Sequence, residues 1–285
     1  MTSDAISGGD AQMRNTGATV KTAIAGLGTI GTTLARQLSQ GAISGIELVA
    51  IAARDPQKAR AVLDEIGCGV PVLPIADLVS VADLVVECAP AAILPEIARP
   101  MLAAGKKVMV LSAGALLSNP DLLDLAKQTG GQIIVPTGAL LGLDAVSAAA
   151  EGKIESIRMV TRKPVNGLLG APYLEEHAIE IVGITEPLKV FDGTAREAAK
   201  GFPANLNVAV ALSLAGIGPD ETRLEIWADP TVTRNTHRIM VDSDSARIDM
   251  TIENIPTENP KTGRITALSV LAALRKLNGP LRVGT

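Results

Sequence analysis

Three glycines near the start of the chain restrict its fold more than any other sequence feature. Gly26, Gly28 and Gly31 follow an apolar run at residues 20–25 and precede an amphipathic stretch at residues 32–40. In a strand–turn–helix segment of this kind, the first glycine permits a tight turn and the second lets the backbone approach a pyrophosphate. The third lets the helix pack closely on the strand, and the free N–H groups of the helix then face the phosphates. This pattern predicts a dinucleotide site whose contacts include Gly26, Gly28, Thr29, Ile30 and Gly31.

Apolar runs and amphipathic stretches alternate from this loop to about residue 143. Further strands are predicted at residues 47–53, 84–87, 107–111 and 132–135, and helices at residues 56–66, 93–104 and 122–129. Such alternation with short connections is typical of a doubly wound parallel sheet. Aromatic residues are only 1% of the chain, so its core must be aliphatic, which suits parallel strands covered by helices. We therefore expect an α/β fold with an N-terminal Rossmann domain at residues 20–143, after a flexible tail at residues 1–19.

The pattern changes after about residue 144. Strands are predicted at residues 154–163, 188–192, 223–228, 236–241 and 247–253, and helices at residues 203–215 and 263–276. Several of these strands alternate polar and apolar residues, which indicates an α+β substrate domain at residues 144–256 with a mainly antiparallel sheet and few helices. A sheet needs its apolar face covered, so we expect an exposed sheet in this domain to mediate a homodimer.

The ends of the predicted strands supply further candidate contacts with the cofactor. The residue after the second strand usually distinguishes NAD from NADP, and this chain has Arg54 there, followed by Asp55. An arginine accommodates a 2′-phosphate, which favours NADP or the use of both cofactors, unless Arg54 is simply a solvated loop residue. Ligands bind beyond the carboxyl ends of parallel strands, so Ala89, Pro90 and Ala113 are expected to border the cofactor.

Composition and charge exclude several classes of function. The formal net charge is −4, with no long run of one sign, and aromatic residues are scarce, which argues against nucleic-acid binding. No apolar stretch is long enough to span a bilayer and the N-terminus lacks the pattern of a signal peptide, so we expect a cytoplasmic protein. Cys68 and Cys88 are expected to be reduced, and Cys88 is interpreted as a buried structural residue rather than a nucleophile. No cluster of Cys and His has metal-ligand spacing, so no metal is predicted.

Several motifs in the second half are more specific than the glycine loop. They are VPTGA at residues 135–139 with GLD at 142–144, TRKP at 161–164, FPANLNVA at 202–209, ADP at 228–230 with NTH at 235–237, and ENPKT at 258–262. In this order and spacing, together with the glycine loop, they closely resemble the L-aspartate dehydrogenase family over residues 20–277. The resemblance implies oxidation of L-aspartate with NAD or NADP to iminoaspartate, and then to oxaloacetate and ammonia. It also implies that iminoaspartate could supply NAD biosynthesis, and that the closing helix within residues 257–285 packs back on the Rossmann domain.

The resemblance also assigns roles to individual residues. By position, Ala139 and Asn207 match the family's contacts with the nicotinamide cofactor, and His237 matches its catalytic histidine. Asn207 could instead be the N-cap of the helix that it opens, a role that asparagine favours. Many family members carry an acidic residue at the position of Arg54, so this difference argues against a strict preference for NAD.

The chemistry of the residues agrees with such a reaction. The developing imine must lose a proton and then accept water. A group that titrates near neutrality can carry out both proton transfers, and histidine has that unperturbed pKa. His177 is interpreted as solvated, and His237 as catalytic or, alternatively, as a core histidine with a satisfied hydrogen bond. A dicarboxylate substrate needs cations, and the candidates are Arg162, Lys163, Arg234 and Lys261. The predicted substrate contacts are Lys163, Asn207, His237 and Lys261.

Two other functions fit the same sequence features. A different two-domain enzyme with a Rossmann half, of the dihydrodipicolinate reductase or homoserine dehydrogenase type, would share this architecture. The histidine-rich signature expected of the former is missing from the middle of the chain. A non-catalytic NADP-binding sensor would bind the cofactor and a partner protein without turnover.

Overall fold

The first half of the chain folds around a five-stranded parallel sheet. The computed structural model describes residues 19–203, 206–256 and 263–285, so the tail expected at residues 1–19 lies almost wholly outside the described residues. The strand order is β2-β1-β3-β4-β5, and every pairing is parallel. Because the order reverses between β1 and β3, the carboxyl ends of these two strands form the point at which doubly wound sheets bind ligands. The strands are β1 (Val20–Ala25), β2 (Ile46–Ala52), β3 (Leu84–Glu87), β4 (Lys107–Val110) and β5 (Gln132–Ile134).

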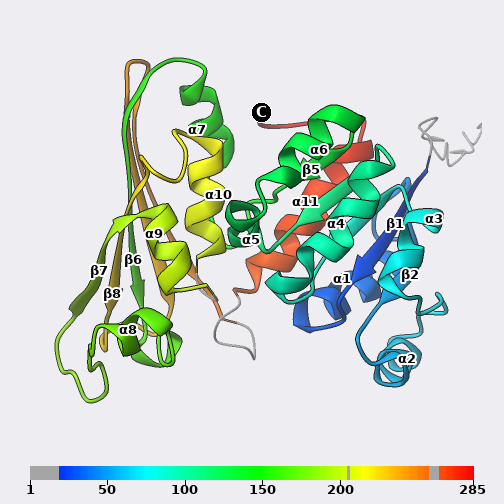
Figure 1. Ribbon diagram of the computed structural model, residues 1–285, viewed down its shortest axis with the longest axis horizontal. Coiled ribbons are helices and arrows are strands. Elements are labelled where there is room, and N and C mark those ends of the chain that lie inside the picture. The colour runs from blue at the N-terminus through cyan, green and yellow to red at the C-terminus, as the bar shows by residue number, and fades with distance from the viewer. Residues whose placement is uncertain (1–18, 204–205, 257–262) are drawn as a thin grey trace, which may run out of the picture.

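Helices cover both faces of this first sheet (Figure 1). One face packs against α3, α4 and α6, and the other against α1 and α11, the last helix of the chain. Val270 and Leu274 of α11 are buried in one cluster with Ile24 of β1 and Leu34 of α1. The helices are α1 (Thr29–Ser39), α2 (Pro56–Glu65), α3 (Leu78–Val81), α4 (Leu94–Ala103), α5 (Ala113–Ser118), α6 (Asp121–Thr129) and α11 (Ile265–Asn278), with short 3-10 turns at Ile75–Asp77 and Ala91–Ile93. The predicted parallel α/β sheet is confirmed.

The second half contains another five-stranded sheet, of the order β10-β9-β6-β8-β7. The pair β6 and β8 is parallel, and the other three pairs are antiparallel. A mainly antiparallel sheet was the expectation, and this part of the fold class is confirmed too. The strands are β6 (Ile154–Lys163), β7 (Leu188–Thr194), β8 (Arg223–Ala228), β9 (Asn235–Ser243) and β10 (Arg247–Asn254).

Helices are more numerous in the second half than the sequence pattern indicates. The helix expected at residues 203–215 begins only at Asn207, and a separate helix precedes it. That earlier helix starts with a capping box, in which Thr194 and Glu197 satisfy each other's backbone N–H groups. These helices are short, and Ala-rich sequences such as LDAVSAAA show little periodicity, so the pattern does not reveal them. They are α7 (Leu143–Ala150), α8 (Pro172–Glu176), α9 (Ala195–Gly201) and α10 (Asn207–Ala215), with a 3-10 turn at Val165–Gly167.

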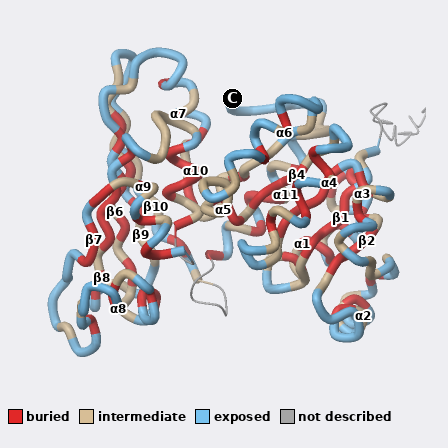
Figure 2. The backbone as a smooth tube through the Cα atoms, in the orientation of Figure 1, coloured by how far each residue is buried: buried red, intermediate tan, exposed pale blue. Residues whose placement is uncertain are grey.

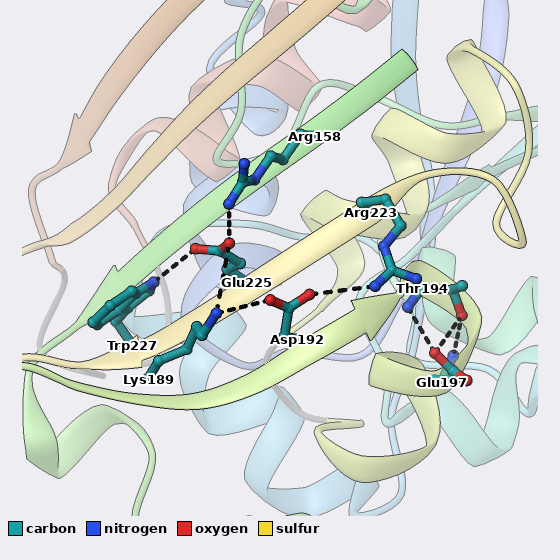
Figure 3. Close-up of polar contacts among 8 residues, drawn as sticks. All are labelled: Arg158, Lys189, Asp192, Thr194, Glu197, Arg223, Glu225 and Trp227. Carbon is teal, nitrogen blue, oxygen red and sulfur yellow. Dashed lines mark hydrogen bonds and ion pairs between the residues drawn. The ribbon is translucent and has the colours of Figure 1, made fainter. Parts of the chain in front are cut away.

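The two faces of the second sheet differ in chemistry. The inner face is packed under helices of the same chain, and Figure 2 shows buried residues interspersed with intermediate and exposed ones along the strands. The outer face carries charged side chains, and in Figure 3 the Glu225 carboxylate lies between Arg158, Lys189 and the indole N–H of Trp227. The homodimer expected through this sheet stays a prediction, but an apolar face of the sheet is not what a partner would cover. The chain covers that face itself and leaves a polar face open.

Candidate active site

The three glycines of the loop have different structural reasons. Gly26 has a φ of +103°, and a Cβ there would collide with the backbone carbonyl of Cys88. A Cβ on Gly31 would collide with the carbonyl oxygen of Gly26, so the helix can approach the strand only without a side chain. Gly28, the residue before α1, has no atom within 4 Å of the position a Cβ would take. Its backbone is therefore open to a ligand at the helix N-terminus, which fits a dinucleotide pyrophosphate.

At the end of β2, one of the two charged side chains already has a structural role. Asp55 is the N-cap of α2, and its Oδ1 accepts hydrogen bonds from the N–H groups of Gln57 (3.1 Å) and Lys58 (3.0 Å). This carboxylate satisfies the first turn of the helix. Arg54 is exposed beside it, so the guanidinium is the charged group available to a ribose 2′-substituent.

A cavity of about 460 Å³ lies between the two halves of the chain. The first half lines it with the ends of β3 and β4 and with the segment at residues 135–139, and the second half with β6, β9, β10 and α10. Gly26, Gly28, Thr29 and Gly31 lie on the glycine loop and Arg54 at the end of β2, outside this lining. Lys261 lies outside the described residues. The predicted site residues that line the cavity are Ile30, Ala89, Pro90, Ala113, Ala139, Lys163, Asn207 and His237.

A buried carboxylate closes the cavity at the ends of β3 and β4. Glu87 accepts hydrogen bonds from the N–H groups of Leu111 (3.1 Å) and Ser112 (2.9 Å) and from the Ser112 hydroxyl (3.0 Å). Burial raises the pKa of Glu87, and these hydrogen bonds oppose that rise. Burial and the Glu87 charge raise the pKa of the neighbouring Cys88 thiol, so this cysteine stays protonated and is a poor nucleophile.

His237 is the buried histidine of the cavity. It is 3% exposed, and its Nδ1 lies 3.1 Å from the hydroxyl of Thr161, the residue opposite it on β6. Burial, with the positive charge of Lys163, lowers the pKa of His237 to about 3. The imidazole is therefore neutral at physiological pH, and in the free protein it is a weaker base than the near-neutral titration expected from the sequence. His177, the other histidine, is exposed and stacks on Tyr173.

The candidate cations separate onto the two faces of the second sheet. Lys163 is 4% exposed and, among the described residues, is the one Lys or Arg that lines the cavity. Arg162, one residue earlier, points to the other face, where it pairs with Asp229 (2.9 Å) and lies over the Trp227 ring. Arg234 lies outside the cavity lining and has Glu253 at 4.0 Å as its ionic partner. Strand alternation therefore turns Lys163 toward the cavity and Arg162 away from it.

Two asparagines fix the walls of the cavity. Asn207 is not the N-cap of α10; its Oδ1 accepts a hydrogen bond from the Gly114 N–H (3.1 Å) in the first half. Asn254, at the end of β10, donates from Nδ2 to the carbonyl of Ala139 (2.9 Å). Sequence reasoning identified the first but missed the second, and it gave Glu87 no role, because no motif marks a polar residue that ends a buried strand.

Comparison with known proteins agrees with both halves of this architecture. Residues 26–136 match the family model described as homoserine dehydrogenase, NAD binding domain, and residues 144–277 match the one described as aspartate dehydrogenase, C-terminal. L-aspartate dehydrogenase 3 of Bordetella bronchiseptica is 61% identical over 263 residues, which are 92% of this chain and 97% of that protein. The chain belongs to the aspartate dehydrogenase family. The L-aspartate dehydrogenase of Methanosarcina mazei is 40% identical over 271 residues, covering 93% of this chain and all of that protein.

Solved structures show the same fold in this family and beyond it. The crystal structure of aspartate dehydrogenase from Thermotoga maritima has a TM-score of 0.71 at 24% identity, covering 93% of this chain and 99% of that one. Myo-inositol 2-dehydrogenase from Lactobacillus plantarum has a TM-score of 0.50 at 16% identity, covering 91% and 87% of the two chains. Within the described residues, no helix has the length and apolarity to cross a membrane, and no group of three His, Cys, Asp or Glu side chains could hold a metal ion.

Proposed function

We propose that the protein catalyses the reversible oxidation of L-aspartate with NAD or NADP to iminoaspartate, which is hydrolysed to oxaloacetate and ammonia. Membership of the aspartate dehydrogenase family and relatives with that name at 61% identity support the substrate. The observation that carries the chemistry is a neutral, buried His237 beside Lys163 in the cavity that the dinucleotide-binding half borders.

Four residues that line the cavity have roles in this proposal. A bound NAD or NADP supplies the acceptor for the hydride that leaves Cα of L-aspartate. Lys163 pairs with a substrate carboxylate, and Ala139 and Asn207 border the nicotinamide end of the cofactor. In the tautomer whose Nδ1–H donates to the Thr161 hydroxyl, Nε2 of His237 is the nitrogen that takes a proton from the amino group. Water then adds to the C=N bond, the proton passes back to the amine, and ammonia leaves.

The low pKa of His237 suits a site that binds a dianion. In the free protein, burial and Lys163 keep the imidazole neutral and make it a weak base. The carboxylates of bound L-aspartate bring negative charge into the cavity, which offsets Lys163 and favours the protonated imidazole. Substrate binding therefore strengthens the base at the moment when it is needed.

Substrate and cofactor assays test this proposal. The protein is incubated with NAD or NADP and L-aspartate, L-glutamate or homoserine, while the absorbance of the reduced cofactor is followed. Turnover with L-aspartate and scarcely any with the other two is the expected result. Turnover with homoserine alone would point to the other dehydrogenase type, and cofactor binding without any turnover would point to a sensor.

Substitution of His237 separates catalysis from binding. His237→Ala is expected to lower kcat by about 10²- to 10⁴-fold, the usual contribution of a general base, while calorimetry shows unchanged NAD affinity. His177→Ala is the matched control, because His177 is exposed and outside the cavity. Unchanged turnover in His237→Ala would remove this residue from the mechanism.

Several broader features belong to the same proposal. We place the division into domains at residues 20–143, 144–256 and 257–285, and the enzyme in the cytoplasm, where its iminoaspartate would feed NAD biosynthesis. The use of NADP as well as NAD is supported by Arg54 at the end of β2. A homodimer through the open, charged face of the second sheet is also proposed. Light scattering of the protein in solution tests it, and a monomer mass would refute it.

A further inference from the structure

One buried polar atom in the cavity has no hydrogen-bond partner within the described part of the chain. It is Oδ1 of Asn254, a residue that is 3% exposed and lines the cavity. The other end of the same amide is fully used, because Nδ2 donates to the carbonyl of Ala139 at 2.9 Å. This hydrogen bond fixes the orientation of the amide, so the unpartnered end is an acceptor.

Gly263 lies beside this oxygen in the wall of the cavity. A Cβ built on Gly263, which also lines the cavity, would lie 3.2 Å from Oδ1. Glycine at this position therefore keeps the space beside the oxygen free of a side chain. A buried carbonyl oxygen without a partner destabilises a fold, and most such atoms in proteins are satisfied. Its retention in a cavity is explained if a bound ligand supplies the missing donor.

The strand register places Asn254 beside the proposed base. In the β9–β10 ladder, Asn254 is opposite Asn235 and Ile252 is opposite His237. Asn254 and His237 are therefore diagonal neighbours on the inner face of the sheet, a relationship that brings Cα atoms to about 7–8 Å. Lys163 lines the same cavity from β6. An acceptor, the proposed base and a cation thus line one cavity.

The chemistry of the proposed substrate matches these three groups. L-aspartate has two carboxylates, which need cationic or N–H donors, and one amino group, which needs acceptors. Building on the function proposed above, we propose that Asn254 is a specificity-determining residue whose Oδ1 accepts a hydrogen bond from the amino group of L-aspartate. The same oxygen repels a carboxylate, so it orients the substrate with its amino group toward β10 and His237.

Binding to the enzyme with reduced cofactor tests this assignment without turnover. L-aspartate and NADH are both reduced, so they form a dead-end complex whose affinity calorimetry measures. Succinate is the matched ligand, because it keeps both carboxylates and lacks the amino group. Asn254→Leu should weaken L-aspartate binding by about 10- to 100-fold, the effect of losing a hydrogen bond to a charged group, and leave succinate affinity nearly unchanged.

Two further variants separate this contact from the support that Asn254 gives to Ala139. Asn254→Asp keeps an acceptor and should retain the preference for L-aspartate over succinate, even where its added charge weakens both ligands. Ser269→Ala removes the hydrogen bond of 3.0 Å that holds the neighbouring Gly138 N–H, and should affect both ligands alike. If Asn254→Leu folds poorly, the ratio of L-aspartate to succinate affinity in Asn254→Asp, compared with the ratio in Ser269→Ala, still tests the contact.

The outcomes distinguish this inference from the proposed function. An unchanged ratio of L-aspartate to succinate affinity in Asn254→Leu, or the loss of that preference in Asn254→Asp, overturns it. Weakened NADH binding with an unchanged ratio would also overturn it, because the partner would then be the carboxamide of the nicotinamide ring. If wild-type protein oxidises L-aspartate in either case, the function stands and only the role of Asn254 falls.

Discussion

Keeping His237 neutral in the fold makes the protein sensitive to acid. The pKa of this imidazole is about 3 in the folded chain, against the ordinary value of 6.5 expected after unfolding. Below pH 6.5, His237 is protonated in the unfolded chain but stays neutral in the folded chain. The free energy of unfolding therefore decreases as the pH falls from 6.5 toward 3. At pH 5 the loss is about 2 kcal/mol, from 1.5 pH units at about 1.4 kcal/mol each. Because His237 is only 3% exposed, water screens its interactions little.

Chemical denaturation of three proteins at pH 7 and pH 5 measures this loss. Carboxylates contribute equally to all three, so their effect cancels in the comparison. Wild type and the control His177→Gln should lose about 2 kcal/mol more free energy of unfolding on acidification than His237→Gln does. The absolute stability of His237→Gln does not matter, since only its change with pH is compared. The same loss in all three proteins would show that His237 titrates normally in the fold, and the argument for a neutral base would fail.

Other substitutions probe the cofactor side of the site. Arg54→Ala should raise KM for NADP by about 10-fold or more and scarcely change KM for NAD, and equal effects would show that Arg54 does not contact a 2′-phosphate. Gly28→Ala should fold normally, because a Cβ there meets no atom, but should lose affinity for both cofactors in a fluorescence titration. Gly31→Ala should melt at a clearly lower temperature, because its Cβ would collide with the Gly26 carbonyl oxygen. Normal cofactor binding by Gly28→Ala would contradict the loop assignment. Glu87→Gln presents an amide N–H₂ to backbone donors and should lower the free energy of unfolding by about 1–3 kcal/mol, and an unchanged denaturation midpoint would contradict its role between β3 and β4.

Local pattern was sufficient for most strands of both sheets. The predicted bounds of β1, β3, β6 and β8 agree with the structure, because each is an apolar or alternating run with clear ends. The short helices α5, α7, α8 and α9 were missed, since segments of five to eight residues show too few turns for a helical period. Their positions depend on tertiary packing and, for α9, on its capping box, and single-sequence periodicity reveals neither.

Site residues that lie in sequence motifs could be predicted, whereas those whose position depends on strand register could not. His237, Lys163 and Asn207 lie in motifs that carry the family resemblance, and the structure brings all three to one cavity. Arg162 could be excluded as a cation of the cavity only from the structure, where strand alternation places its side chain on the opposite face of the sheet from Lys163. Asn254 depends on the β9–β10 register, which joins residues on two strands only after the sheet has formed. Pairing between residues on different strands cannot be predicted from the local sequence pattern.

The position of α11 has a consequence for how the chain can be made. Its Val270 and Leu274 complete the apolar layer that also contains Ile24 and Leu34, so the first segment to leave the ribosome needs the last one to finish its core. A nascent chain that ends at residue 143 exposes that layer to water, and a truncation before α11 leaves it exposed permanently. The N-terminal body, although first in sequence, therefore cannot complete its native packing until the last helix of the chain has been made.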